Sequence, residues 1–217
     1  MSPGGRRRSP GGPPRLLGLT GGIATGKSTA ARCFAREGAR IVDADRVARE
    51  VVAPGSPALQ EIRRTFGPEV IRPDGTLDRP ALARRVFGDR RARARLNAIV
   101  HPRVAQEVDR QIEAAFREDP DGLVVYDVPL LFEGGLEGRC DLVVVVYVPR
   151  DEQKRRLMAR DGLSPEEADA RLASQMDIEE KARRADVVLD NRGSVEDLHR
   201  QIRELLRRLR RSWETGA

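Results

Sequence analysis

The sequence has few cysteines and no long apolar run, and each absence excludes a class of protein. Its two cysteines, Cys33 and Cys140, lie far apart and lack the C-x-x-C or Cys/His spacing of a zinc site or a disulfide scaffold. No run of apolar residues approaches the length that a membrane-spanning helix needs. We therefore expect a protein of a reducing compartment, the cytoplasm, that does not enter the membrane.

Aromatic residues and lysine are also scarce. Aromatics make up 4% of the chain, which leaves few side chains on which the bases of a single-stranded nucleic acid can stack. Lysine occurs at three positions, Lys27, Lys154 and Lys181, so arginine supplies nearly all of the positive charge behind the formal net charge of +6. A basic balance of this kind suits polyanionic small molecules or nucleic acid, and we interpret most of the arginines as a solvated surface.

The length of 217 residues allows a good core but is short for two full-sized domains. Residues 1–14 are rich in arginine, glycine and proline, with no apolar segment after them, so we expect a disordered tail rather than a targeting segment. We place the folded domain at 15–212 and a short C-terminal tail at 213–217.

Residues 21–28 (GGIATGKS) match G-x-x-x-x-G-K-[ST] at every fixed position and follow the apolar run at 16–19. Glycines let such a loop curl so that backbone N–H groups point at phosphate oxygens, and the helix that begins near Lys27 adds its positive dipole end. Lys27 is placed to reach the β- and γ-phosphates, and the Ser28 hydroxyl to bind Mg²⁺. With so little lysine, chance assembly of the pattern has a probability of about two in a thousand. The stretch therefore predicts a nucleotide-phosphate site.

Short β-branched runs alternate with longer helical patterns, which is typical of a parallel sheet with helices on both faces. The expected strands are 16–20, 40–42, 123–126, 142–148 and 187–189. The run at 142–148 has no polar alternation, so both of its faces should be covered. We therefore predict an α/β fold of the P-loop NTPase type with a doubly wound, parallel five-stranded sheet.

Two helical segments extend this plan. Residues 47–120 are rich in arginine and alanine and far exceed what a crossover needs, so they predict an inserted helical domain for a second substrate. Further on, Asp161 and Gly162 break one helix, and Ser164 with Glu167 caps the next. This helix–turn–helix predicts a lid at about 155–180.

The phosphate loop alone does not choose among GTPases, motors, ATPases and kinases. A guanine-reading N-K-x-D motif is absent, because the two asparagines, Asn97 and Asn191, are followed by Ala98 and Arg192. The sequence therefore favours ATP as the nucleotide, with Mg²⁺ as its cofactor.

Three aspartates follow expected strands, and the carboxyl ends of parallel strands face the ligand crevice of an open sheet. Asp43 and Asp45 follow the second strand, where a carboxylate can accept a hydroxyl proton or hold Mg²⁺ through water; Asp45 can equally cap the helix after it. Asp127 follows the third strand, where the acid that assists Mg²⁺ is expected.

Other side chains carry weaker hypotheses. Arg156 and Arg160 share a helix face and are candidates to clamp a transferred phosphoryl group or to be ordinary surface arginines. The apolar run that begins at Leu130 is either core or a substrate contact. His101 precedes Pro102 at the expected start of a helical stretch, where a lone histidine is more often a capping or core residue than a catalyst.

Several motifs follow one another in a single order, and together they resemble the dephospho-CoA kinase family from about residue 16 to residue 208. Apart from the phosphate loop each motif is weakly specific, but their common register is highly specific. The motifs are 19–23 (LTGGI) with 26–29 (GKST), 43–45 (DAD), 77–79 (LDR), 96–102 (LNAIVHP), 128–133 (VPLLFE), 173–175 (ASQ), 185–186 (AD) and 190–191 (DN).

The resemblance implies transfer of the γ-phosphate of ATP to the ribose 3′-hydroxyl of dephospho-CoA, the last step of coenzyme A synthesis. By position it implies that Asp45 is the base at this hydroxyl and that Arg156 stabilises the transferred group beside Lys27. It makes 47–120 the acceptor-binding domain. The residues implied to bind ATP are Gly22, Ala24, Thr25, Gly26, Lys27, Ser28, Thr29 and Arg160, and those implied to contact the acceptor are Asp45, Leu130 and His101.

Two other functions stay open on the sequence. Another small-molecule kinase, such as a nucleoside monophosphate kinase, shares the phosphate loop and the lid but differs in its acceptor. A nucleic-acid-binding ATPase would use the arginines as a phosphate track, and its binding would weaken steeply with salt. We expect ATP and dephospho-CoA as partners, neither nucleic acid nor membrane, and a monomer.

Overall fold

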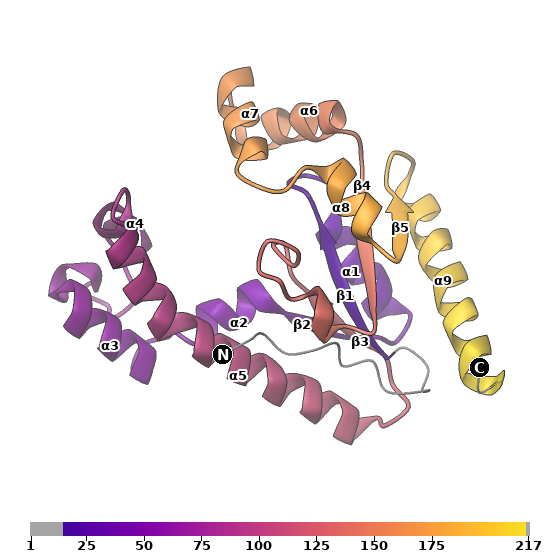
Figure 1. Cartoon of the computed structure of the whole chain (residues 1–217), viewed down its shortest axis with the longest axis horizontal. Helices are drawn as coiled ribbons and strands as arrows, with labels where there is room; N and C mark the ends of the chain where they lie inside the picture. Colours follow the sequence, from indigo (N-terminus) through magenta and orange to yellow (C-terminus); the bar gives the residue numbers. More distant parts are fainter. Residues whose placement is uncertain (1–14, 216–217) are drawn as a thin grey trace. The chain divides into compact units, whose positions relative to one another are not determined.

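The computed structural model of the chain describes residues 15–215 (Figure 1). The tail expected at 1–14 lies outside the described residues, and so do the last two residues. The tail expected from 213 onward overlaps the last helix, which continues to Thr215.

The predicted five-stranded sheet is confirmed, and every strand lies within two residues of its expected bounds. The strands are β1 (Leu16–Gly21), β2 (Arg40–Asp43), β3 (Val124–Asp127), β4 (Leu142–Tyr147) and β5 (Val187–Asp190). Their order is β2-β3-β1-β4-β5, with β1 parallel to β3 and β4, and β4 parallel to β5. The register sets Leu19 of β1 beside Asp127 of β3 and Val144 of β4. The phosphate loop thus leaves the central strand of the sheet.

Nine helices and two short 3-10 turns connect the strands within the described residues. They are α1 (Lys27–Arg36), α2 (Ala44–Glu50), α3 (Pro57–Phe66), η1 (Pro68–Val70), α4 (Arg79–Val86), α5 (Arg90–Glu118), η2 (Glu137–Arg139), α6 (Arg150–Asp161), α7 (Pro165–Ala173), α8 (Ile178–Arg184) and α9 (Val195–Thr215). One helix begins at its expected cap, and another ends at its expected break. Ser164 and Glu167 form the predicted capping box of α7, and Gly162 ends α6 in the left-handed conformation at φ 66°.

The chain divides into two compact units, 42–117 and the remainder. In the larger unit α1 and α9 pack together over one face of the sheet, and α9 follows β5 (Figure 1). The core between them is apolar and includes Leu17, Phe34, Val144 and Ile202, each fully buried. Val143 to Val146 of β4 are all buried, as the absence of polar alternation predicts.

The smaller unit has an apolar core of its own. Side chains from α3, α4 and the first half of α5 surround Ile62 and Val70, which are fully buried. Proline at the start of α3 and α4 and the caps Ser56 and Asp78 fix where these two helices begin. A helical unit at this point of the chain agrees with the prediction of an insertion.

In this unit the capping alternative for Asp45 and the predicted start of a helix at His101 are both wrong. Asp45 does not cap α2: the cap is Asp43, whose Oδ1 accepts hydrogen bonds from the backbone N–H groups of Asp45 (2.8 Å) and Arg46 (3.0 Å). His101 and Pro102 do not begin a helix, because α5 starts at Arg90 and holds Pro102 in its interior. The helix continues past the proline, and the Ile99 carbonyl at this interrupted turn accepts from the Arg103 side chain (2.6 Å).

Neither cysteine forms a disulfide, as their spacing in the sequence indicates. Cys33 and Cys140 are free and buried, and burial raises the pKa of the Cys140 thiol to about 12. Within residues 15–215, no helix combines the length and the apolar character that crossing a bilayer requires.

Candidate active site

The phosphate loop joins β1 to α1 through two residues with positive φ, Ala24 (60°) and Gly26 (88°). The Thr25 hydroxyl donates to the Gly22 carbonyl (2.9 Å) and closes the curl. Gly26 is the N-cap of α1 and has no side chain to accept from the first N–H groups of the helix. These donors, together with the helix dipole, suit the oxygens of a phosphate.

Lys27 is held by a residue one hundred positions away. Its Nζ lies 2.5 Å from Oδ1 of Asp127 at the end of β3, and both side chains are largely buried. The register of β1 with β3 brings the two together, since Leu19 pairs with Asp127 just before the loop. The structure therefore places Asp127 beside the phosphate loop, and its role toward Mg²⁺ stays a prediction.

Two amide side chains occupy the space that the loop glycines leave open. A Cβ on Gly22 would collide with Oε1 of Gln153, and a Cβ on Gly26 would collide with Nδ2 of Asn191. That Nδ2 donates to the Thr25 carbonyl (2.8 Å). A side chain at Gly22 would therefore displace Gln153, whereas at Gly26 the backbone conformation (φ 88°) itself favours glycine.

Arg156 is linked to the phosphate loop through Asn191. Its Nη2 donates to the Asn191 carbonyl (2.9 Å), and its Nε pairs with Glu152 (2.6 Å). Arg160 pairs instead with its neighbour Asp161 (2.7 Å) and is 60% exposed. Hydrogen bonds from Arg160 lower the pKa of Asp161. The structure therefore ties Arg156 to the loop and places Arg160 at the outer end of α6.

The lid helices pack directly on the phosphate loop. Leu157 of α6 and Leu172 of α7 form a small apolar cluster with Ile23 and Ala24 of the loop. The helix–turn–helix predicted at 155–180 is thus continuous with the nucleotide site.

The apolar run after β3 divides between core and surface. Leu131 and Phe132 are buried, whereas Leu130 between them and Pro129 is 46% exposed. The alternative left open by the sequence is resolved residue by residue: two of the three are core, and Leu130 is free to contact a ligand.

Sequence reasoning missed a buried polar cluster beside this run. Lys181 of α8 is fully buried, and its Nζ donates to the Glu133 carboxylate (2.9 Å) and to the Pro129 carbonyl (3.0 Å). Burial by itself raises the pKa of Glu133, but hydrogen bonds from Lys181 and from the Met176 N–H outweigh it and leave this pKa lowered. The rarity of lysine in the sequence could have pointed to Lys181. Each of the three lysines forms an ion pair with a carboxylate.

In the smaller unit Asp45 lies in the first turn of α2, with an exposed side chain. Oδ1 of Asp43 is committed to the cap. His101 is exposed on α5. The roles predicted for these side chains stay predictions.

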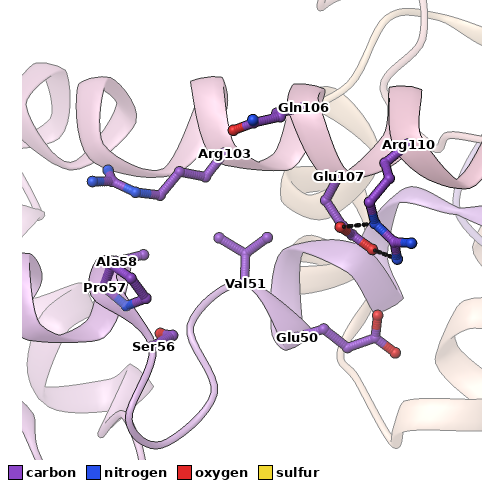
Figure 2. Close-up of a pocket in the computed structure, with 9 residues that line it drawn as sticks. All are labelled: Glu50, Val51, Ser56, Pro57, Ala58, Arg103, Gln106, Glu107 and Arg110. Atoms are coloured by element: carbon purple, nitrogen blue, oxygen red, sulfur yellow. Dashed lines mark hydrogen bonds and ion pairs between the residues drawn. The ribbon is translucent and has the colours of Figure 1, made fainter.

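A groove of about 430 Å³ opens in the smaller unit between α5 and the segment from the end of α2 to the start of α3 (Figure 2). Its floor is apolar, with Val51 and Ala58, and its rim is polar. Figure 2 shows Arg110 folded onto Glu107, and hydrogen bonds from Arg110 and Gln111 lower the pKa of Glu107 to about 2. The groove begins at Glu50, five residues along α2 from Asp45, or about 7.5 Å at the helical rise.

The donors near the loop fit Mg²⁺ of the kind that accompanies a nucleotide. Within residues 15–215 no cluster of three or more His, Cys, Asp or Glu side chains is arranged to hold a metal by itself. Mg²⁺ does not need one, because it keeps several waters and binds one or two protein oxygens plus substrate phosphates. The Ser28 hydroxyl in the first turn of α1 and the Asp127 carboxylate are oxygen donors of this type.

Comparison with known proteins gives a consistent result. The model of the family described as Dephospho-CoA kinase matches residues 15–197. A protein of Anaeromyxobacter dehalogenans named Dephospho-CoA kinase is 56% identical over 196 residues, covering 90% of this chain and 92% of that protein. A protein of Symbiobacterium thermophilum with the same name is 51% identical over 87% of this chain and 78% of its own length.

Solved structures agree with the sequence matches. The Thermus thermophilus protein TT1252 is 41% identical, with a TM-score of 0.76 over 90% of this chain and 98% of its own. The dephospho-CoA kinase from Campylobacter jejuni is 28% identical, with a TM-score of 0.62 over 90% of this chain and 97% of its own.

Proposed function

The chain belongs to the dephospho-CoA kinase family, and from that premise we propose how its residues transfer phosphate. It is an ATP-dependent kinase that acts on dephospho-CoA. The observation that carries the proposal is the pairing of Lys27 with Asp127 (2.5 Å) at a loop whose backbone N–H groups and helix dipole suit phosphates.

ATP binds with its phosphates in the loop 22–29. The Lys27 ammonium contacts the β- and γ-phosphates, and Asp127 holds that ammonium in place until the nucleotide arrives. Mg²⁺ would be held by the Ser28 hydroxyl, with Asp127 and Asp43 as partners through water. When bound, the metal neutralises charge on the phosphates.

Asp45 acts as the base for the acceptor. Its carboxylate takes the proton of the ribose 3′-hydroxyl, the freed oxygen attacks the γ-phosphorus, and ADP leaves with the bridging oxygen. Two observations support this role. Asp43, not Asp45, caps α2, and the Asp45 side chain is exposed.

Arg156 stabilises the charge that spreads over the oxygens of the transferred group. Its support is the hydrogen bond to Asn191, which in turn holds the Thr25 carbonyl of the loop. Arg160, near the C-terminal end of α6, contacts ATP in this proposal after exchanging its pair with Asp161 for a phosphate.

The smaller unit holds the acceptor. The groove that starts at Glu50 offers an apolar floor and a rim with the Gln106 amide and the Ser56 hydroxyl, which suits an amide-bearing chain attached to a nucleotide (Figure 2). Leu130 and His101 are proposed as further acceptor contacts. The use of ATP and the two free thiols fit the cytoplasm.

The test is a coupled assay of ADP release with dephospho-CoA, AMP or CMP as acceptor. We expect turnover with dephospho-CoA and not with the monophosphates. Preferred transfer to AMP or CMP would show a nucleoside monophosphate kinase instead. ATP hydrolysis that is stimulated by nucleic acid, with no transfer to any small acceptor, would show the third function considered above.

A further inference from the structure

Among the described residues, Lys181 is the one charged residue with no solvent exposure at all. It lies on α8, a helix of seven residues, with its side chain fully buried. Removing an ammonium group from water is expensive, and an apolar side chain of similar volume at a buried ion pair often gives a protein at least as stable. A gain in stability is therefore a weak explanation for this lysine, and its hydrogen bonds point to another role.

The acceptors of Lys181 belong to the segment that follows β3. One is the carbonyl of Pro129 (3.0 Å) and the other is the carboxylate of Glu133 (2.9 Å). These two residues flank the run that presents Leu130, whose neighbours Leu131 and Phe132 are buried. The Lys181 ammonium thus holds the residues on both sides of the 130–132 run, in which Leu130 is exposed.

The same two acceptors also receive hydrogen bonds from other parts of the site. The Thr20 hydroxyl, at the end of β1 just before the phosphate loop, donates to the Pro129 carbonyl (3.0 Å). The Met176 N–H, in the segment that joins α7 to α8, donates to Glu133 (2.9 Å). Lys181 therefore lies where the phosphate loop, the 129–133 segment and the base of the lid converge.

We propose that Lys181 is a positioning residue for phosphate transfer: its buried ammonium holds the 129–133 segment in register with the phosphate loop and the base of the lid. The proposal rests on the function proposed above. A displacement of the segment by about 1 Å would misalign the acceptor with the γ-phosphate, and errors of that size cost up to about a hundredfold in rate.

The decisive variant is the double substitution Lys181→Met with Glu133→Gln. Lys181→Met alone leaves the Glu133 carboxylate without its cation, so we expect it to lower Tm by about 5 °C or more. The double variant has no unpaired charge, so its Tm should return to within about 2 °C of the native value. It still lacks both hydrogen bonds that the Lys181 ammonium donates to the 129–133 segment.

We expect the double variant to lose kcat for dephospho-CoA by about tenfold, while its Kd for ATP stays within about twofold of native. The matched control is Lys154→Met, which removes the ion pair of Lys154 with Asp169 (2.6 Å) on the surface of the lid and should leave kcat within about twofold. Recovery of both Tm and kcat in the double variant would overturn the proposal, because it would show a role in stability alone.

If the double variant does not fold, Thr20→Val takes its place, since it removes the other donor to Pro129 without leaving a charge. A fall in kcat of about threefold is then expected, and native kcat would overturn the proposal. If the native enzyme does not use dephospho-CoA, the proposed function is refuted. If the native enzyme uses it and the variant has native kcat, only the proposal for Lys181 is refuted.

Discussion

The two units of the molecule build their polar contacts in different ways. In the larger unit the contacts around the phosphate loop join distant parts of the chain: Lys27 to Asp127, 100 positions apart, and Asn191 to Thr25, 166 apart. In the smaller unit most of the described side-chain bonds are caps and helical pairs within five residues, and Arg103 with Glu61 spans 42.

The difference indicates how firmly each unit fixes the side chains of its site. Long-range hydrogen bonds hold the phosphate-binding groups of the protein in fixed positions before the nucleotide binds, which is what electrostatic stabilisation of a transition state requires. Local caps fix where helices begin but leave their side chains to the solvent. We therefore expect substitutions in the larger unit to act on kcat, and those in the smaller unit, apart from the proposed base, to act on acceptor KM.

Asp45→Asn tests the proposed base, the one residue of the smaller unit that we expect to act on kcat, and it has the largest expected effect. Asparagine keeps the shape of the side chain but cannot accept the 3′-hydroxyl proton, so turnover should fall by roughly 10² to 10⁴. Because Asp43 is the cap, Tm should not change. Asp43→Ala is the companion variant and should lower the free energy of unfolding by about 1 kcal/mol. Near-native turnover of Asp45→Asn in the ADP-release assay would reject the base.

Lys27→Ala removes the charge from the loop and should lower kcat by about a hundredfold or more. It also leaves the largely buried Asp127 without its cation, so Tm should fall as well. Turnover is therefore measured well below the Tm of the variant, beside Lys154→Ala as a control for losing a lysine ion pair. Activity within a few-fold of native would contradict the role of the loop.

Arg156→Ala should lower kcat by about tenfold to a hundredfold while ATP affinity stays nearly native, if the guanidinium acts on the transition state. Arg155 is the matched control, because it lies on the same helix, pairs with the same Glu152 and is 72% exposed. Titration calorimetry with ATP and steady-state kinetics on both variants decide the point. A loss of ATP affinity with kcat unchanged would make Arg156 a uniform binding residue.

Gln106→Trp has the smallest expected effect. The indole would fill part of the groove, so KM for dephospho-CoA should rise by about three- to tenfold with kcat and ATP affinity unchanged. Asn97→Trp, exposed on the same helix and outside the groove, is the control. An equal effect of both variants would mean that the groove is not where the acceptor lies.

The elements that local rules govern were predictable from the sequence. The strands, the phosphate loop and the capping box of α7 each depend on neighbouring residues, through side-chain periodicity, glycine conformation or a cap. The errors are also local. Asp43 and Asp45 are both competent caps and only the exact start of α2 distinguishes them, while Pro102 is a probable helix boundary that α5 passes through.

The sequence by itself determined the class of fold, the phosphate loop and, through several motifs in one register, the family. Tertiary structure alone decided which distant groups meet: Asp127 with Lys27, Asn191 with Thr25 and Arg156, and Glu133 with Lys181. The physical reason is that a motif records neighbours along the chain, whereas strand register and helix packing bring together residues whose spacing carries no pattern.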